Sequence, residues 1–196
     1  MYKLNNIKAI GLLAFIIVAL AACKPDEADF KSPSFSNNPD VFMDDFSSGL
    51  QYAVFQGASF SAFDVTSEVT YGGSASAMRF AVPDVNSSDG SYAGGTFFVG
   101  DGRDLSEYNT LSFYAKATKS ATIDVIGFGI SFGEDLYEVS TSIDVNTNWK
   151  KYYIPIPDAS KLSSEKGLLH FAEGPENGLG YTFWLDEIKF EKTGLL

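Results

Sequence analysis

Short runs of alternating apolar and polar residues recur along most of the chain. Met78, Phe80 and Val82 are the apolar positions of SAMRFAV, and every second residue of TLSFYAKA (110–117) is apolar again. A period of two is the pattern of a strand with one buried face. Clusters of Gly, Asn, Asp and Ser separate the runs and predict turns. No segment shows the 3.6-residue period of an amphipathic helix.

Further runs of this kind lie in the second half of the chain, at 121–132, 137–145, 149–156 and 181–190. Pro155 and Pro157 cannot donate ladder hydrogen bonds, so we expect their strand to lie at a sheet edge or to end there. Trp149 stands just before this strand, and we expect it to fill the core. Eight to ten strands without helices predict an all-β fold, a two-sheet jelly-roll β-sandwich.

The first 22 residues break this pattern and predict a signal peptide. Lys3 and Lys8 precede the apolar run AIGLLAFIIVAL, which is too short for a comfortable membrane span, and small residues follow it. LAAC (20–23) resembles the lipobox of bacterial lipoproteins, which implies cleavage before Cys23 and acylation of Cys23. A plain signal peptide with an incidental cysteine is the alternative. Cys23 is the only cysteine, which excludes an internal disulfide.

Residues 23–40 predict a flexible tether from the lipidated cysteine, because they are polar, contain three prolines and show no period. KPDE (24–27) resembles the short acidic signal that sends lipoproteins of Bacteroidetes-type bacteria to the outside of the outer membrane. A generic solvated linker fits it equally well.

Charge narrows the possible partners. Loss of the two lysines of the signal leaves 12 basic residues against 25 acidic ones, a formal charge of −13. Such a surface is repelled by nucleic acid and by anionic head groups. We therefore expect no nucleic-acid partner, and membrane attachment through the lipid anchor only.

Five motifs follow one another in a familiar order. They are VFMDDFSSGL (41–50), VTYGGSASAMRF (69–80), GRDLSEYNTLSFYAKA (102–117), NTNWKKYYIPIPDASKL (146–162) and YTFWLDEIKF (181–190). In this order they resemble the galactose-binding-like jelly rolls that serve as carbohydrate-binding modules, many of them attached to glycoside hydrolases or surface glycan-binding lipoproteins of bacteria. The resemblance covers 41–192, the predicted domain, and leaves 193–196 as a tail or the start of a linker. It implies a non-catalytic domain that binds a polysaccharide or oligosaccharide.

Two adjacent carboxylates, Asp186 and Glu187, interrupt the last apolar run. Neighbours on a strand point to opposite faces, so these two cannot form an acid–base pair across one sugar. The resemblance implies a structural Ca²⁺ held by Asp44 or Asp45, by carbonyls around Gly73 and by Asp186, with Glu187 turned to solvent. The alternative is a solvated edge strand whose charges prevent aggregation.

A sugar-binding surface needs aromatic rings and planar polar side chains. The chain has 17 Phe, 10 Tyr and 2 Trp, more than a core of this size requires. The candidates are Trp184, which is out of phase with its apolar neighbours, Tyr92 in a long polar loop, Tyr137, Glu138 and Arg79. They fit either a concave sheet face or the loops at one end.

His170 is the only histidine, which excludes a multi-histidine zinc site. The sequence therefore predicts a non-catalytic lipoprotein, lipid-anchored in the outer membrane and facing the cell exterior. It would hold a polysaccharide for glycoside hydrolase or glycan-import partners. The alternative function is a structural spacer or protein-interaction module of a larger surface assembly.

Overall fold

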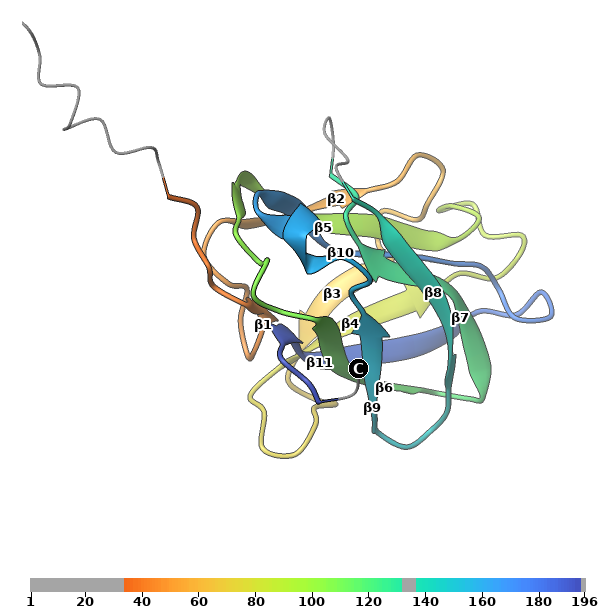
Figure 1. Ribbon diagram of the computed structural model, residues 1–196. Helices are drawn as coiled ribbons and strands as arrows, with labels where there is room; N and C mark the ends of the chain where they lie inside the picture. The colour runs from red at the N-terminus through yellow and green to blue at the C-terminus, as the bar shows by residue number, and fades with distance from the viewer. Residues whose placement is uncertain (1–33, 132–136, 195–196) are drawn as a thin grey trace, which may run out of the picture. The chain divides into compact units, whose positions relative to one another are not determined.

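The computed structural model describes residues 34–131 and 137–194, which form a sandwich of two antiparallel sheets (Figure 1). The predicted all-β, two-sheet jelly-roll fold is confirmed. The predicted signal peptide, Cys23 and residues 24–33 of the predicted tether lie outside the described residues. Within the described ranges, no helix is long and apolar enough to cross a membrane.

Eleven strands are described, one more than the upper end of the predicted eight to ten. The six-stranded sheet has the order β3 (Phe63–Thr66), β4 (Ala77–Val82), β11 (Tyr181–Glu191), β6 (Thr110–Ala117) and β9 (Lys150–Pro155), and β1 (Asp40–Phe42) also pairs with β11. The five-stranded sheet has the order β2 (Leu50–Val54), β5 (Ala93–Arg103), β10 (Glu165–Glu173), β7 (Ala121–Phe128) and β8 (Val139–Val145). A short 3₁₀ helix, η2 (Ala159–Leu162), precedes β10.

The inner faces of both sheets meet in an aromatic core. The ring of Phe80 on β4 lies 4.7 Å from that of Phe183 on β11 and 4.5 Å from that of Phe171 on β10 in the opposite sheet. All three side chains are fully buried. Burial of one such side chain contributes about 1.5–3 kcal/mol, so the alternation found in the sequence also stabilises the contact between sheets.

Two local expectations fail for geometric reasons. The strand predicted for 121–132 ends at Phe128, because Gly129 has a φ of 96° and a Cβ there would lie 2.0 Å from the carbonyl oxygen of Tyr137. Trp149 is only partly buried and lies outside the core. The buried positions of β9 are Tyr152 and Ile154, so residue 149 belongs to the outward set. The expectation for β9 itself holds: it is an edge strand that ends at Pro155.

A buried arginine attaches the segment that precedes β1. The guanidinium of Arg103 donates to the carbonyl oxygen of Asn38 at 3.1 Å and to that of Asp40 at 2.5 Å. It also donates to Ser47 Oγ at 2.8 Å. The compact unit begins at Phe35, so residues 35–40 of the predicted tether are bonded to the domain.

Candidate functional site

An extra residue in β11 explains the carboxylate pair in the last strand. Asp186 pairs with Tyr114 of β6 and Lys189 pairs with Ser112, so three steps along β11 match two along β6. Glu187 is the inserted residue of this β-bulge and has a left-handed φ of 47°. The bulge changes the parity of the strand: residues 183 and 185 are buried before it, and 188 and 190 after it. Asp186 is therefore on the outer face, and Glu187 is half-buried.

Asp186 is fully buried although it faces outward, because the loop before β4 covers it. Its Oδ2 accepts a hydrogen bond from the Tyr71 amide at 2.8 Å, and its Oδ1 accepts from Ser74 Oγ at 3.0 Å. Burial raises the pKa of Asp186, and the charge of Asp44 raises it further. A second negative charge therefore stands close to a buried carboxylate.

Asp44 joins the same cluster, as the resemblance implied. Its Oδ1 accepts from Ser74 Oγ at 2.7 Å and from the Ala75 amide at 2.6 Å, and these hydrogen bonds lower the pKa of Asp44. Asp45 is exposed, as Asp44 is, but its Oδ1 accepts from the amide of Phe46 at 2.8 Å instead of from the cluster. Gly73 is exposed in the turn that carries Ser74.

Three oxygen acceptors surround the Ser74 hydroxyl, although backbone amides also donate to both carboxylates. Ser74 Oγ lies within hydrogen-bond distance of Asp44 Oδ1, Asp186 Oδ1 and the Ser76 carbonyl oxygen, at 2.7, 3.0 and 2.8 Å, but a hydroxyl has one proton to donate. Such an oxygen-rich group suits a hard cation. The described residues contain no set of three or more His, Cys, Asp or Glu side chains able to hold a metal, so carbonyl oxygens would have to complete the shell.

The predicted ligand residues do not form one site. Arg79 and Trp184 are cross-strand partners on the outer face of the six-stranded sheet, where Arg79 pairs with Asp64 at 3.1 Å. Tyr92 and Glu138 immediately precede β5 and β8, two strands of the other sheet. The Tyr92 hydroxyl donates to the Gln56 carbonyl oxygen at 3.0 Å, and its ring occupies the space above Gly94 of β5. Tyr137 is partly buried, with Lys161 Nζ 4.9 Å from its ring centre.

One row of residues crosses the outer face of all five strands of the smaller sheet. In register it reads Ala53, Thr96, His170, Gly127 and Ser140, from β2 to β8. The three middle residues, Thr96, His170 and Gly127, are buried, and the Thr96 hydroxyl donates to the carbonyl oxygen of Ile130, which follows β7. Only the two ends of the row are open, because Ala53 is half-buried and Ser140 is exposed. Gly127 is required, because a Cβ there would lie 1.9 Å from the Val139 carbonyl oxygen and 3.0 Å from His170 Cε1.

An apolar hollow of about 620 Å³ lies at the β2 end of this row. Its lining consists of Tyr52, Ala53, Val54, Phe60 and Phe98. Phe60 is 80% exposed, which is unusual for so large an apolar side chain. Neither Phe60 nor Phe98 was predicted. The adjacent pair Phe97–Phe98 held a signal for the second, because two neighbours on a strand cannot both face the core.

At the β8 end the row becomes polar. Ser140 Oγ donates to Glu138 Oε1 at 2.7 Å and lies 2.9 Å from His170 Nε2. With the serine proton on the carboxylate, a His170 ring protonated at Nε2 would donate to the serine oxygen. A nucleophilic serine needs the opposite order, with the histidine accepting the serine proton. This group fixes side-chain positions and offers Glu138 and Ser140 to a ligand.

Residues 35–192 match the family model of carbohydrate-binding domain 30. The chain belongs to this family. The predicted resemblance to carbohydrate-binding modules is thereby confirmed, and the family supports non-catalytic glycan binding. None of the curated proteins matches this chain.

Solved structures agree with the fold. The family 30 carbohydrate-binding module of the cellulosomal cellulase Cel9D-Cel44B of Clostridium thermocellum is 22% identical with a TM-score of 0.52, over 82% of this chain and 96% of that one. The family 11 module from Clostridium thermocellum, in complex with a β-1,3-1,4-mixed-linked tetrasaccharide, is 20% identical with a TM-score of 0.51, over 83% and 98%. At these identities the similarity shows the fold alone.

Proposed function

We propose that this family 30 domain binds a polysaccharide chain along the outer face of its five-stranded sheet. The observation that carries the proposal is the apolar hollow of Phe60 and Phe98 at one end of the row, opposite the exposed Glu138 and Ser140 at the other end. Five strands about 4.8 Å apart separate the two ends by roughly 19 Å, a distance that several sugar units span. The row and the hollow contain no lysine or arginine.

Each end of the row suits a different part of a sugar. The C–H-rich face of a pyranose ring packs against aromatic rings, which Phe60 and Phe98 supply. Hydroxyl groups need hydrogen-bond partners, and the exposed side chains of Glu138 and Ser140 supply an acceptor and a hydroxyl. His170 is fully buried, so it holds Ser140 in place and does not meet the sugar itself.

The cellular setting of the proposal comes from the first residues of the chain. The lipobox-like LAAC supports acylation of Cys23, and the KPDE that follows supports export to the outside of the outer membrane. A domain anchored there would hold a glycan for glycoside hydrolases and import proteins. Labelling of the full-length protein with a radioactive fatty acid, compared with its Cys23→Ser variant, tests the anchor. Loss of protein from intact cells treated with protease tests the outward orientation.

A structural Ca²⁺ is also part of the proposal, with Asp44, Asp186 and carbonyl oxygens of the turn at 72–76 as ligands. The shortage of donors around Ser74 supports it. When bound, the ion would neutralise two neighbouring carboxylates. The side chains of Asp44 and Asp186 would then tie the loop before β4 to the last strand, without contact to the glycan row.

Affinity electrophoresis of residues 24–196, which include the whole compact unit, tests glycan binding in gels that contain a panel of polysaccharides. We expect retardation by at least one neutral polysaccharide and its loss in the Phe60→Ala variant. Tyr153→Ala is the matched control, because Tyr153 is an exposed aromatic side chain of the six-stranded sheet, 43% exposed. Retardation by no glycan would instead favour the spacer function, and equal loss in both variants would remove the site from this face.

A further inference from the structure

The outer face of the six-stranded sheet carries a second group of aromatic rings, far from the glycan row because it faces away from the other sheet. In register, Arg79, Trp184 and Lys116 lie side by side on β4, β11 and β6. The next row contains Tyr114 of β6. Its ring stacks on that of Tyr71 with 3.5 Å between centres and 15° between planes.

Trp149 completes this group. Its ring meets the edge of the Tyr71 ring, with 6.0 Å between centres and 72° between planes. We call Tyr71, Tyr114, Trp149 and Trp184 the aromatic face. Both tryptophans of the chain therefore belong to it. The indole N–H of Trp184 is buried and finds no acceptor within residues 34–131 and 137–194, so an oxygen-rich ligand could satisfy a donor that is now unpaired.

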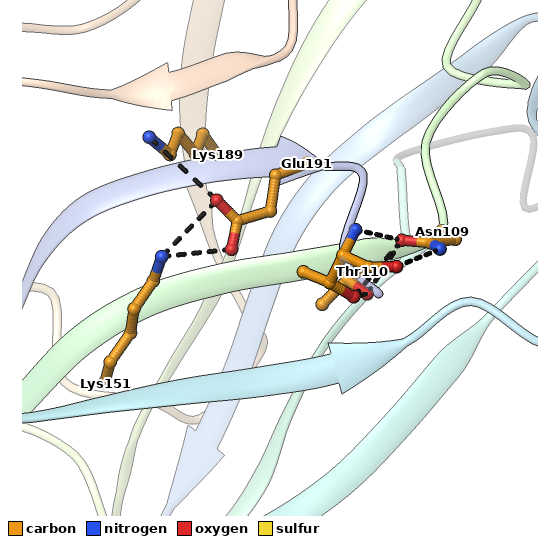
Figure 2. Close-up of polar contacts among 6 residues, drawn as sticks. Asn109, Thr110, Lys151, Lys189 and Glu191 are labelled. Atoms are coloured by element: carbon orange, nitrogen blue, oxygen red, sulfur yellow. Dashed lines mark hydrogen bonds and ion pairs between the residues drawn. The ribbon is translucent and has the colours of Figure 1, made fainter. Parts of the chain in front are cut away.

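The cations of this face differ in their partners. Lys151 Nζ lies 3.0 Å from Glu191 Oε1, and Lys189 Nζ lies 4.0 Å from Glu191 Oε2 (Figure 2). Arg79 is likewise paired with Asp64. Each of these three basic residues lies within ion-pair distance of a carboxylate, and Lys151 and Lys189 share one.

Lys116 is the exception. It makes no ion pair with any residue of the described part of the chain, although its neighbours on the face do. Its Nζ lies 5.8 Å from the ring centre of Trp184 and 6.0 Å from that of Trp149. The ammonium group is thus held between two indoles by cation–π attraction and keeps its donors for another partner.

An ammonium group beside flat aromatic rings matches an anionic sugar, which has a C–H face for the rings and a carboxylate or sulfate for the cation. We propose that the aromatic face is a second carbohydrate site, which takes a uronate or sulfated sugar unit and recognises its charge through Lys116. It is independent of the neutral glycan row.

The negative net charge of the domain limits which polyanions this site admits. Double-stranded DNA presents one charge per about 1.7 Å, and the surrounding acidic surface repels it. A polysaccharide with about one charge per sugar presents its charges singly. At physiological ionic strength the screening length is about 8 Å, so carboxylates beyond that distance weaken the contact with Lys116 only slightly.

The two tryptophans make this site directly observable, because their fluorescence reports the aromatic face and not the glycan row. The test titrates residues 24–196 with three oligosaccharide probes: oligogalacturonate, a sulfated carrageenan oligosaccharide and a neutral glucan. We expect one anionic probe to change the tryptophan emission at saturable concentration, and the neutral probe to leave it unchanged. The responding probe tells carboxylate from sulfate. No response to either anionic probe would overturn the proposal.

Variants locate the charge recognition. Lys116→Met should weaken binding of the anionic probe about tenfold or more, and Lys116→Arg should retain most of that binding. Lys192→Met is the matched control, since Lys192 is 62% exposed and its Nζ lies 3.3 Å from Glu107 Oε2. Phe60→Ala should leave the anionic response intact, which separates this site from the proposed function. Equal weakening by the Lys116 and Lys192 variants would show diffuse charge attraction and overturn the site.

Discussion

The two outer faces of the sandwich are built from strands of the same alternation, yet one is low and the other is filled. On the five-stranded sheet the outward positions Ala53, Thr96 and Gly127 have small side chains. Neighbouring backbone covers Thr96 and Gly127, so the open part of this face is the apolar hollow beside Ala53. On the six-stranded sheet they include Trp184 and Tyr114, whose rings pack against neighbours. Folding constrains only the inward-facing residues of each strand, so the outward-facing residues determine where each face can hold a ligand.

The filled face is also the one bound to the oxygen cluster. Asp186 lies on it, and the loop that covers Asp186 supplies Tyr71 to the aromatic face. The low face has no such link in the described residues. The two faces should therefore respond differently to loss of an ion, and the following predictions use this difference, from the largest expected effect to the smallest.

Removal of calcium should have the largest effect and should act on the filled face. A ligand present at about 100 times its dissociation constant stabilises by about 2.7 kcal/mol, so a chelator should lower the melting temperature by roughly 5–10 °C. Tryptophan emission should change, because Trp149 contacts Tyr71. Retardation by a neutral glycan, measured below the new melting temperature, should stay unchanged. In Asp186→Asn the chelator should have no further effect. An unchanged melting temperature in the parent protein would exclude the ion.

A buried glutamate of the five-stranded sheet should give a pH dependence of the stability of the whole domain. Burial raises the pKa of Glu173 on β10 to about 7, and Glu173 Oε2 accepts a hydrogen bond from the Asp124 amide of β7 at 2.7 Å. The folded protein therefore keeps a proton that the unfolded chain loses near its ordinary pKa of 4.5. Stability is greatest below that value and falls as the pH rises through about 7.

The expected loss is on the order of 1–3 kcal/mol. Urea unfolding of the parent and of Glu173→Gln between about pH 5 and about pH 8 measures it. The variant cannot lose a proton at this position, so its unfolding free energy should vary much less over this interval. Curves that remain parallel would show that Glu173 does not titrate in the folded state.

One substitution made on each outer face should separate the two faces by binding. Ala172 and Ala81 are both half-buried outward alanines, next to Gly94 on β5 and Thr182 on β11, respectively. Ala172→Phe would raise the floor of the glycan row and should weaken neutral-glycan retardation about tenfold or more. Ala81→Phe should leave it unchanged. Equal effects of the two variants, measured at equal melting temperatures, would contradict the assignment of the row.

The smallest effect is expected for the ion pairs of the filled face. Glu191 pairs with both Lys151 and Lys189 in Figure 2. Its side chain is 21% exposed, and ion pairs in contact with solvent contribute only about 0.2–1 kcal/mol. Glu191→Gln should lower the unfolding free energy by less than about 1 kcal/mol. The same variant should also strengthen binding of the anionic probe to the aromatic face, since two lysines lose their shared counter-ion. A double-mutant cycle with Lys151→Met isolates the pairwise energy.

Alternation predicted the strands with clear periods, and the fold class followed from them. Segment 110–117 is β6 residue for residue, because each apolar position faces the same core. The sequence also placed Asp44, the turn of Gly73 and Asp186 together through the family resemblance. Physical reasoning from one strand could not do so, since the cluster joins three segments that are distant in sequence.

The glycan row was not predictable from the same signals. Its members are small or polar residues, such as Ala53 and Ser140, that carry no pattern of their own and align only when five strands are in register. Aromatic residues drew attention instead to Trp184, which lies on β11, and to Tyr92, which lies in the loop before β5. The bulge at Glu187 was equally hidden, because one inserted residue changes parity without changing composition.

The hydrogen bonds between Arg103 and the segment that precedes β1 have a mechanical consequence. Arg103 and Phe98 lie on the same strand, β5, five residues apart, which is roughly 17 Å. A pull on the segment that leads to Asn38 loads several Arg103 hydrogen bonds at once, so they must break together. Tension between that segment and a glycan held over Phe98 would run along β5 and bypass the rest of the core. Under load we expect the sugar to slip from its ring before the sandwich opens.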